Sequence, residues 1–162
     1  MKDSIELNNI NKLYDQQSLE IMYAAEEALV RGVNRVEEIK NFAHKAGIKR
    51  IGIASCISFP KEAEAVKQFL SDEFEVFGIN CKCGRISKQE MLGRPGNGIM
   101  CNPAGQAEYL KANQTELNIS MGLCVGHDMI FNQKSAAPVS VLVVKDHANK
   151  HNPLESIRQL KD

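Results

Sequence analysis

The chain has no excess of positive or negative charge: it carries 20 Lys and Arg residues and 20 Asp and Glu residues. A balanced chain builds no broad field that attracts polyanions, so the sequence predicts a protein that binds neither nucleic acid nor an anionic membrane surface. No apolar run approaches the roughly 20 residues needed to cross a bilayer. Residues 1–11 also lack the charged-then-apolar pattern of a signal peptide, so we expect a cytoplasmic protein.

A disulfide framework is not expected either. A chain of 162 residues corresponds to about one domain and can bury a core without covalent cross-links. Five cysteines, an odd number, would be kept reduced in the cytoplasm. The thiols are therefore core residues, metal ligands or reactive groups. The sequence also lacks the CxxC knuckle that is typical of a zinc ribbon.

The hydrophobic periodicity divides the chain into an N-terminal arm and a single α/β domain. Residues 1–17 are polar and weakly periodic and are predicted to form the arm, and residues 18–162 are predicted to form the domain. Two helices are expected first, over residues 18–32 and 34–47, each ending at a glycine. The Met and Leu stripe of the first helix is typical of a packing face and could also bury the partner of a homodimer.

After these helices, strand patterns alternate with helical patterns. This rhythm favours one three-layer α/β domain with a mostly parallel sheet of about four strands, Rossmann- or flavodoxin-like, joined by right-handed crossovers. Strands are predicted over residues 50–55, 74–79, 118–123 and 139–144, and helices over residues 61–71, 103–112 and 128–133. The Gly-rich segment 84–100 is too long for an ordinary connection, and we expect it to be a mobile lid.

The cysteines come where the predicted strands end: Cys56 after the first, Cys81 and Cys83 after the second, and Cys124 at the end of the third. In a parallel sheet these positions share the edge where open α/β sheets bind ligands. Cys101 precedes Asn102 and Pro103, a pair that is typical of a helix N-terminus, which could lie at the same edge. We therefore predict that the thiols gather into one cysteine-rich site.

Thiolates both bind metals and attack electrophiles, and a helix N-terminus lowers the pKa of a nearby thiol. Four thiolates from separate loops suit a tetrahedral zinc ion or an iron–sulfur cluster. The favoured hypothesis is therefore a redox or metal-dependent protein with the metal ligands Cys56, Cys81, Cys101 and Cys124. For each cysteine taken alone the alternative is a core residue, because cysteine is among the residue types most often buried.

Two other functions remain open for the same edge. One is a metal-free thiol enzyme in which Cys124 is the catalytic nucleophile, His127 is the base, and Cys101 or Cys56 resolves the intermediate. The other is a module that binds a small-molecule ligand beneath the lid. The sequence does not rank substrates or decide whether the protein is an enzyme. The charged run 145–147, after the fourth strand, is expected to be a solvated strand end.

Several motifs carry a resemblance to a known family. They include Ile51-Gly-Ile-Ala-Ser-Cys-Ile57, Cys101-Asn-Pro103, Gly122-Leu-Cys-Val-Gly-His-Asp128 and His151-Asn-Pro153. From Ser18 onward the chain resembles domain of unknown function family 1847, whose members are predicted metal-binding proteins of archaea and anaerobic bacteria.

The resemblance implies a metal site but no established reaction. The positions that match the family's pattern are Cys56, Cys81, Cys101, Cys124, His127, Asp128, Asp146 and His151. Cys83 is an addition of this chain. Many members begin with a separate cysteine-rich segment, whereas residues 1–17 contain no cysteine.

Overall fold

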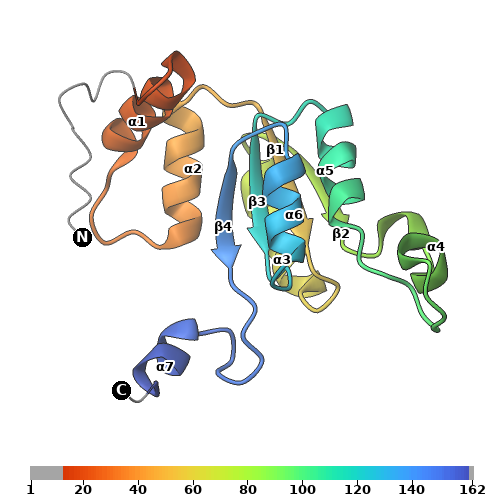
Figure 1. Ribbon diagram of the computed structural model, residues 1–162. Coiled ribbons are helices and arrows are strands. Elements are labelled where there is room, and N and C mark those ends of the chain that lie inside the picture. Colours follow the sequence, from red (N-terminus) through yellow and green to blue (C-terminus); the bar gives the residue numbers. More distant parts are fainter. Residues whose placement is uncertain (1–12, 161–162) are drawn as a thin grey trace. The chain divides into compact units, whose positions relative to one another are not determined.

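Two capped helices form the first part of the described chain. Helix α1 spans Gln16–Ala28 and helix α2 spans Arg35–Lys45 (Figure 1). Asn34 and Glu37 form the capping box that begins α2. The structure, a computed structural model, describes residues 13–160 and contains two compact units that divide between Gly47 and Ile48. Most of the predicted N-terminal arm lies outside the described residues.

The second unit contains one sheet of four parallel strands, as the alternating pattern predicts. Its strands are β1 (Arg50–Ser55), β2 (Glu75–Asn80), β3 (Leu117–Met121) and β4 (Val139–Val143), in the order β2-β1-β3-β4. Ile53 of β1 pairs with Gly78 of β2 on one side and with Ile119 of β3 on the other. Because all strands run the same way, their carboxyl ends lie along one edge, where the arrowheads of Figure 1 point.

Helices on both faces bury the two central strands. The crossover helices are α3 (Pro60–Ser71), α5 (Pro103–Ala112) and α6 (His127–Lys134). Right-handed crossovers place α3 on one face and α5 and α6 on the other, where α5 and α6 pack together (Figure 1). The predicted α/β fold is therefore confirmed.

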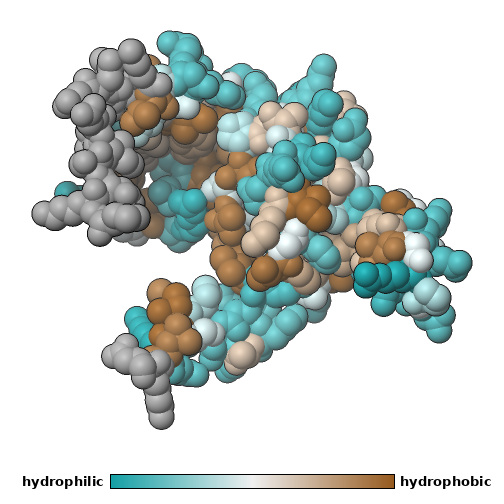
Figure 2. Space-filling model, viewed as in Figure 1, coloured by the Kyte–Doolittle hydropathy of each residue, from teal (hydrophilic) through white to brown (hydrophobic). Residues whose placement is uncertain are grey.

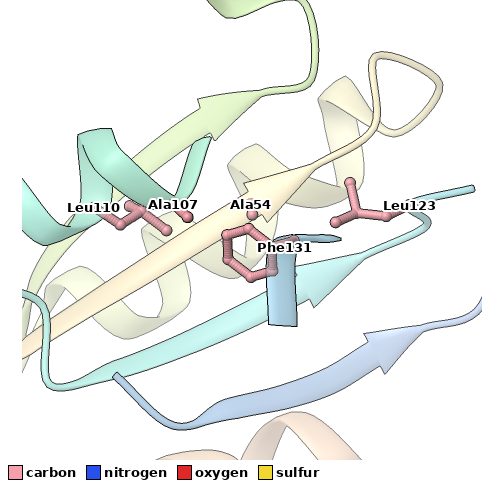
Figure 3. Close-up of a cluster of buried hydrophobic side chains, with 5 residues drawn as sticks. All are labelled: Ala54, Ala107, Leu110, Leu123 and Phe131. Carbon is pink, nitrogen blue, oxygen red and sulfur yellow. The ribbon is translucent and has the colours of Figure 1, made fainter. Parts of the chain in front are cut away.

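The core between these helices and the sheet is apolar. Figure 3 shows one cluster of buried side chains, formed by Ala54, Ala107, Leu110, Leu123 and Phe131. Gly52 of β1 lets α5 approach closely, because a Cβ atom at this position would meet Asn118 and Leu110. The side-chain amide of Gln106 donates to the carbonyls of Ser55 and Ile79, which holds the first turn of α5 beside the ends of β1 and β2.

The Gly-rich segment that was expected to be a lid has regular structure of its own. It contains the 3-10 turn η2 (Cys83–Arg85) and helix α4 (Lys88–Leu92), which Ser87 and Glu90 cap. An isolated antiparallel bridge between Ser87 and Ile99 closes the segment. Residues 92–98 at its tip are exposed.

The chain beyond β4 ends in the short helix α7 (Pro153–Arg158). Leu154 and Ile157 of this helix are exposed, and Figure 2 shows an apolar patch on the C-terminal segment. Within residues 13–160, no helix combines the length and the apolar character that crossing a membrane requires.

Candidate functional site

The strand order creates a topological switch point at the carboxyl ends of β1 and β3. The chain leaves β1 toward β2 and leaves β3 toward β4, so the loops after the two central strands diverge. Such a switch point is where open α/β sheets bind ligands. Cys56 follows β1 directly, and Cys124 lies three residues after the end of β3.

Lys145 joins these two cysteines. Its Nζ atom lies 2.8 Å from the Sγ atom of Cys56 and 3.3 Å from that of Cys124. Lys145 follows β4 and is half-buried, although the run 145–147 was expected to be solvated. The ammonium group therefore sits between two thiols that come from the two central strands.

A second pair of thiols lies at the end of β2 and at the end of the Gly-rich segment 84–100. The Sγ atoms of Cys81 and Cys101 are 3.6 Å apart. The amide of Asn102 donates to the carbonyl of Cys81 at 2.8 Å, which holds the two segments side by side. The Nζ atom of Lys82 lies 2.6 Å from the carbonyl oxygen of Ile99 and 3.4 Å from the sulfur of Cys101.

The two pairs belong to one cluster. Cys56 and Cys81 are buried together with Phe59, and Cys101 and Val143 pack against them. The amide of Ile57 donates to the sulfur of Cys81 at 3.4 Å. The structure thus brings three of the predicted cysteines into one buried cluster, and Lys145 links the fourth, Cys124, to it through Cys56. We call Cys56, Cys81, Cys101 and Cys124 the four-thiol cluster.

Cys83 lies beside the four-thiol cluster rather than in it. Its thiol donates to the carbonyl oxygen of Asn102 at 3.5 Å. Burial raises the pKa of the Cys83 thiol.

The environments of Cys56 and Cys81 drive their pKa values in opposite directions. Burial raises the pKa of Cys56, but hydrogen bonds from Lys145 and from the hydroxyl and amide of Ser58 outweigh it and lower the pKa to about 7. Burial raises the pKa of Cys81 to about 11, and the neighbouring thiols of Cys101 and Cys56 add to that rise. Near neutral pH, Cys56 is therefore the thiol that the surroundings favour as a thiolate.

The two neighbouring sulfurs favour the charged form of Lys145. Burial lowers the pKa of the ammonium group, but the sulfurs of Cys56 and Cys124 overcome that effect and raise it. The 2.8 Å contact thus places Lys145 to form an ion pair with the thiolate form of Cys56.

The contact between Cys124 and His127, the predicted catalytic pair, is a backbone hydrogen bond: the amide of His127 donates to the carbonyl of Cys124 at 2.9 Å. The group beside the Cys124 sulfur is the ammonium of Lys145. A catalytic role for Cys124 and His127 stays a prediction. Lys82 and Lys145 are not among the predicted site residues; their position, two residues beyond the ends of β2 and β4, is the signal that could identify them.

Asp146 anchors the turn that follows Lys145. Its carboxylate accepts hydrogen bonds from the hydroxyl of Ser156 at 2.6 Å and from the amides of Ala148 and Asn149. The bond from Ser156 is the largest cause of a lowered Asp146 pKa. The amide of Asp146 donates to Nδ1 of His151 at 3.2 Å.

The imidazole of His151 links this turn to the residues around the cysteines. Its ring packs edge-on against Phe59, with centroids 4.7 Å apart, and the ring of His147 lies 5.5 Å from it. Through Phe59, which belongs to the buried cluster, the turn after Lys145 is packed against the four-thiol cluster.

The donor chemistry of the cluster suits a soft metal. In a tetrahedral zinc site each zinc–sulfur bond is about 2.3 Å long, so two ligand sulfurs lie about 3.8 Å apart. The sulfurs of Cys81 and Cys101 are separated by a similar distance, 3.6 Å. Cys56 and Cys124 are instead turned to Lys145. Among residues 13–160, no three His, Cys, Asp or Glu side chains are arranged to hold a metal ion. The residues present therefore fit a soft metal in two respects: their donor atoms are thiol sulfurs, and Cys81 and Cys101 are spaced as two ligands of one ion would be.

Comparison with known proteins identifies the family. Residues 1–142 match the family described as "Protein of unknown function (DUF1847)", and the chain belongs to it. The chain is 42% identical over 127 residues to the uncharacterized protein MJ0455 of Methanocaldococcus jannaschii. That match covers 76% of this chain and 66% of the relative, so the chain spans just under two thirds of the relative's length. No solved structure matches the chain.

Proposed function

For this member of family DUF1847, we propose a thiolate metal centre in which Cys56, Cys81, Cys101 and Cys124 hold a zinc ion or an iron–sulfur cluster. The observation that carries the proposal is the convergence of four thiols from four separate segments, each with an N–H donor at its sulfur. The donors are the amides of Ile57 and Ser58 and the ammonium groups of Lys82 and Lys145.

Charge supports this function. Four thiolates carry four negative charges, which a divalent ion and the two ammonium groups of Lys82 and Lys145 would balance. Thiolates are soft ligands and favour zinc and iron–sulfur clusters over hard cations. Hydrogen bonds to the sulfurs also tune the reduction potential of a cluster.

The chain's own residues define what the centre can do. Phe59 and Val143 pack beside the thiols and keep water from the buried sulfurs of Cys56 and Cys81. A bound zinc ion supplies Lewis acidity, and a cluster supplies electron transfer. Binding is expected to weaken in acid, because Cys81 has a raised pKa and must lose its proton to become a ligand.

A metal-free thiol reaction is the second candidate function, favoured by the 2.8 Å contact between Lys145 and Cys56. A lysine ammonium stabilises the thiolate of a neighbouring cysteine and so prepares it to attack an electrophile. In this alternative Cys56 is the nucleophile, whereas the sequence pattern favours Cys124.

Metal analysis of protein purified without oxygen tests the first proposal. We expect bound zinc, or iron with the visible absorption of a cluster, in the wild-type protein. Serine at Cys56, Cys81, Cys101 or Cys124 should each reduce retention sharply. Cys83→Ser is the matched control, since Cys83 lies on the same segment but outside the four-thiol cluster, and it should retain the metal.

Two results would contradict the metal centre. One is a wild-type protein that stays folded but neither contains nor takes up zinc or iron. The other is equal retention in Cys83→Ser and in the four cluster variants. A metal-free protein whose Cys56 is alkylated fastest would support the second candidate instead.

A further inference from the structure

Beyond metal binding, we propose that Cys81 and Cys101 form a reversible dithiol–disulfide couple in the metal-free chain. Cys101 attacks a small disulfide and Cys81 resolves the mixed disulfide. This activity needs no metal. It rests on the proposed function only for its consequence, which is that oxidation releases the metal.

The two sulfurs are already in contact across 20 residues of sequence. Their separation of 3.6 Å must shorten by about 1.5 Å to reach the length of a disulfide bond. The backbone hydrogen bond from Asn102 to Cys81 holds the two segments together. Lys82 ties the same segments a second time through the carbonyl of Ile99. The bond can therefore form by movement of side chains.

The surroundings assign different roles to the two thiols. Cys81 is 2% exposed, whereas Cys101 is only half-buried. An external disulfide therefore meets Cys101 first. The positive Nζ atom of Lys82 lies 3.4 Å from the Cys101 sulfur, beside the atom that would react. Cys81 lies behind it, in position to attack a disulfide formed on Cys101.

The reaction balances with a small disulfide, R–S–S–R, as the oxidant. The thiolate of Cys101 attacks one sulfur, the R–S–S–R bond breaks, and one R–S⁻ leaves. That thiolate takes the proton of Cys81. The sulfur of Cys81 then attacks the sulfur of Cys101 and displaces the second R–S⁻, which takes up the proton first lost by Cys101. Two cysteine thiols lose two electrons, and the small disulfide becomes two thiols.

The consequence for the metal follows from ligand chemistry. A metal binds the thiolate form of cysteine, and two cysteines joined in a disulfide no longer offer thiolates. Oxidation of Cys81 and Cys101 removes two of the four proposed ligands at once. Reduction restores them, so the metal content would respond to the ratio of small thiols to small disulfides.

Peptide mapping tests the couple directly. Metal-free wild-type protein is incubated with oxidised glutathione, free thiols are blocked, and the protein is cleaved with trypsin without reduction. Cleavage after Lys82 separates Cys81, in residues 68–82, from Cys83, in residues 83–85, and Cys101 falls in residues 89–111. We expect residues 68–82 to be linked to residues 89–111, and the link to be lost on reduction.

Variants define the two roles. Cys83→Ser should form the link at the wild-type rate. Cys81→Ser should accumulate a mixed disulfide with glutathione on Cys101, because the resolving thiol is gone. Lys82→Met should slow the first step severalfold. A link between other cysteines, or wild-type protein that keeps all its thiols free, would overturn the proposal.

A parallel experiment on zinc-loaded protein separates the two proposals. Release of zinc as the link forms supports the coupling. If the wild-type chain binds no zinc but still forms the link, the metal centre fails and the couple stands. If zinc binds and glutathione forms no link in the metal-free chain, the couple fails and the metal centre stands.

Discussion

Replacing Lys145 with methionine tests its electrostatic effect on the thiol of Cys56. Methionine keeps most of the length of the side chain but removes the ammonium group 2.8 Å from the sulfur of Cys56. The hydrogen bond from Lys145 is the largest of the causes that lower the Cys56 pKa, while burial acts to raise it. Without Lys145 the pKa should rise from about 7 toward its ordinary value of 9.0, because burial then opposes only the hydrogen bonds from Ser58.

The expected rates follow from these values. At pH 7, a shift of the pKa from about 7 to about 9 lowers the thiolate fraction about 50-fold. A thiolate of higher pKa is more nucleophilic, by about 8-fold for this shift when the Brønsted slope is about 0.45. The alkylation rate of Cys56 at pH 7 should therefore fall by up to roughly 6-fold, and the limiting rate at high pH should rise.

The assay follows alkylation of metal-free protein by iodoacetamide as a function of pH. Tryptic residues 51–61 contain Cys56 as their single cysteine, so mass spectrometry measures this thiol alone. Wild-type reactivity should be low in acid, where Cys56 is protonated, and should rise with a midpoint near pH 7. Lys82→Met is the matched control, because Lys82 contacts Cys101, and it should keep that midpoint. An unchanged midpoint in Lys145→Met would refute the ion pair.

Three further predictions concern the scaffold of the site. Phe131→Ala should lower the free energy of unfolding by about 3–5 kcal/mol because its ring is fully buried, as measured by urea unfolding with circular dichroism; the exposed Tyr109→Ala is the control. Gly122→Ala should be more destabilising than Gly93→Ala in the same assay: both have φ of 64°, but only at Gly122 would the Cβ atom meet Phe59. Asp146, with its lowered pKa, stabilises the fold fully above its ordinary pKa of 3.8, and this stability is lost as pH falls through the lower folded value. Asp146→Asn should lack that pH dependence in acid titrations, and equal acid sensitivity of the two proteins would contradict the anchoring role.

The backbone could be predicted from the sequence because its signals are local. Ile51 and Ile53 belong to a short β-rich run that is followed by a helical pattern, and this rhythm identifies a parallel sheet. Cys56 and Cys81 come directly after such runs, so their place at the carboxyl edge follows from the direction of the strands alone. Asn102 and Pro103 mark a helix start, and Asn102 does cap α5. These inferences need no knowledge of which strands are neighbours.

The partners of the thiols depend on strand order, which the local pattern does not determine. Neighbouring strands are about 4.8 Å apart, and in the order β2-β1-β3-β4 the end of β4 lies two strands from the end of β1. The long side chain of Lys145 reaches across the end of β3 to Cys56 and passes Cys124 on the way. If β4 lay beside β2, the same lysine would face Cys81 instead. The part of the low Cys56 pKa that comes from Lys145 is therefore a property of the topology, whereas the part that comes from Ser58 is local to the sequence.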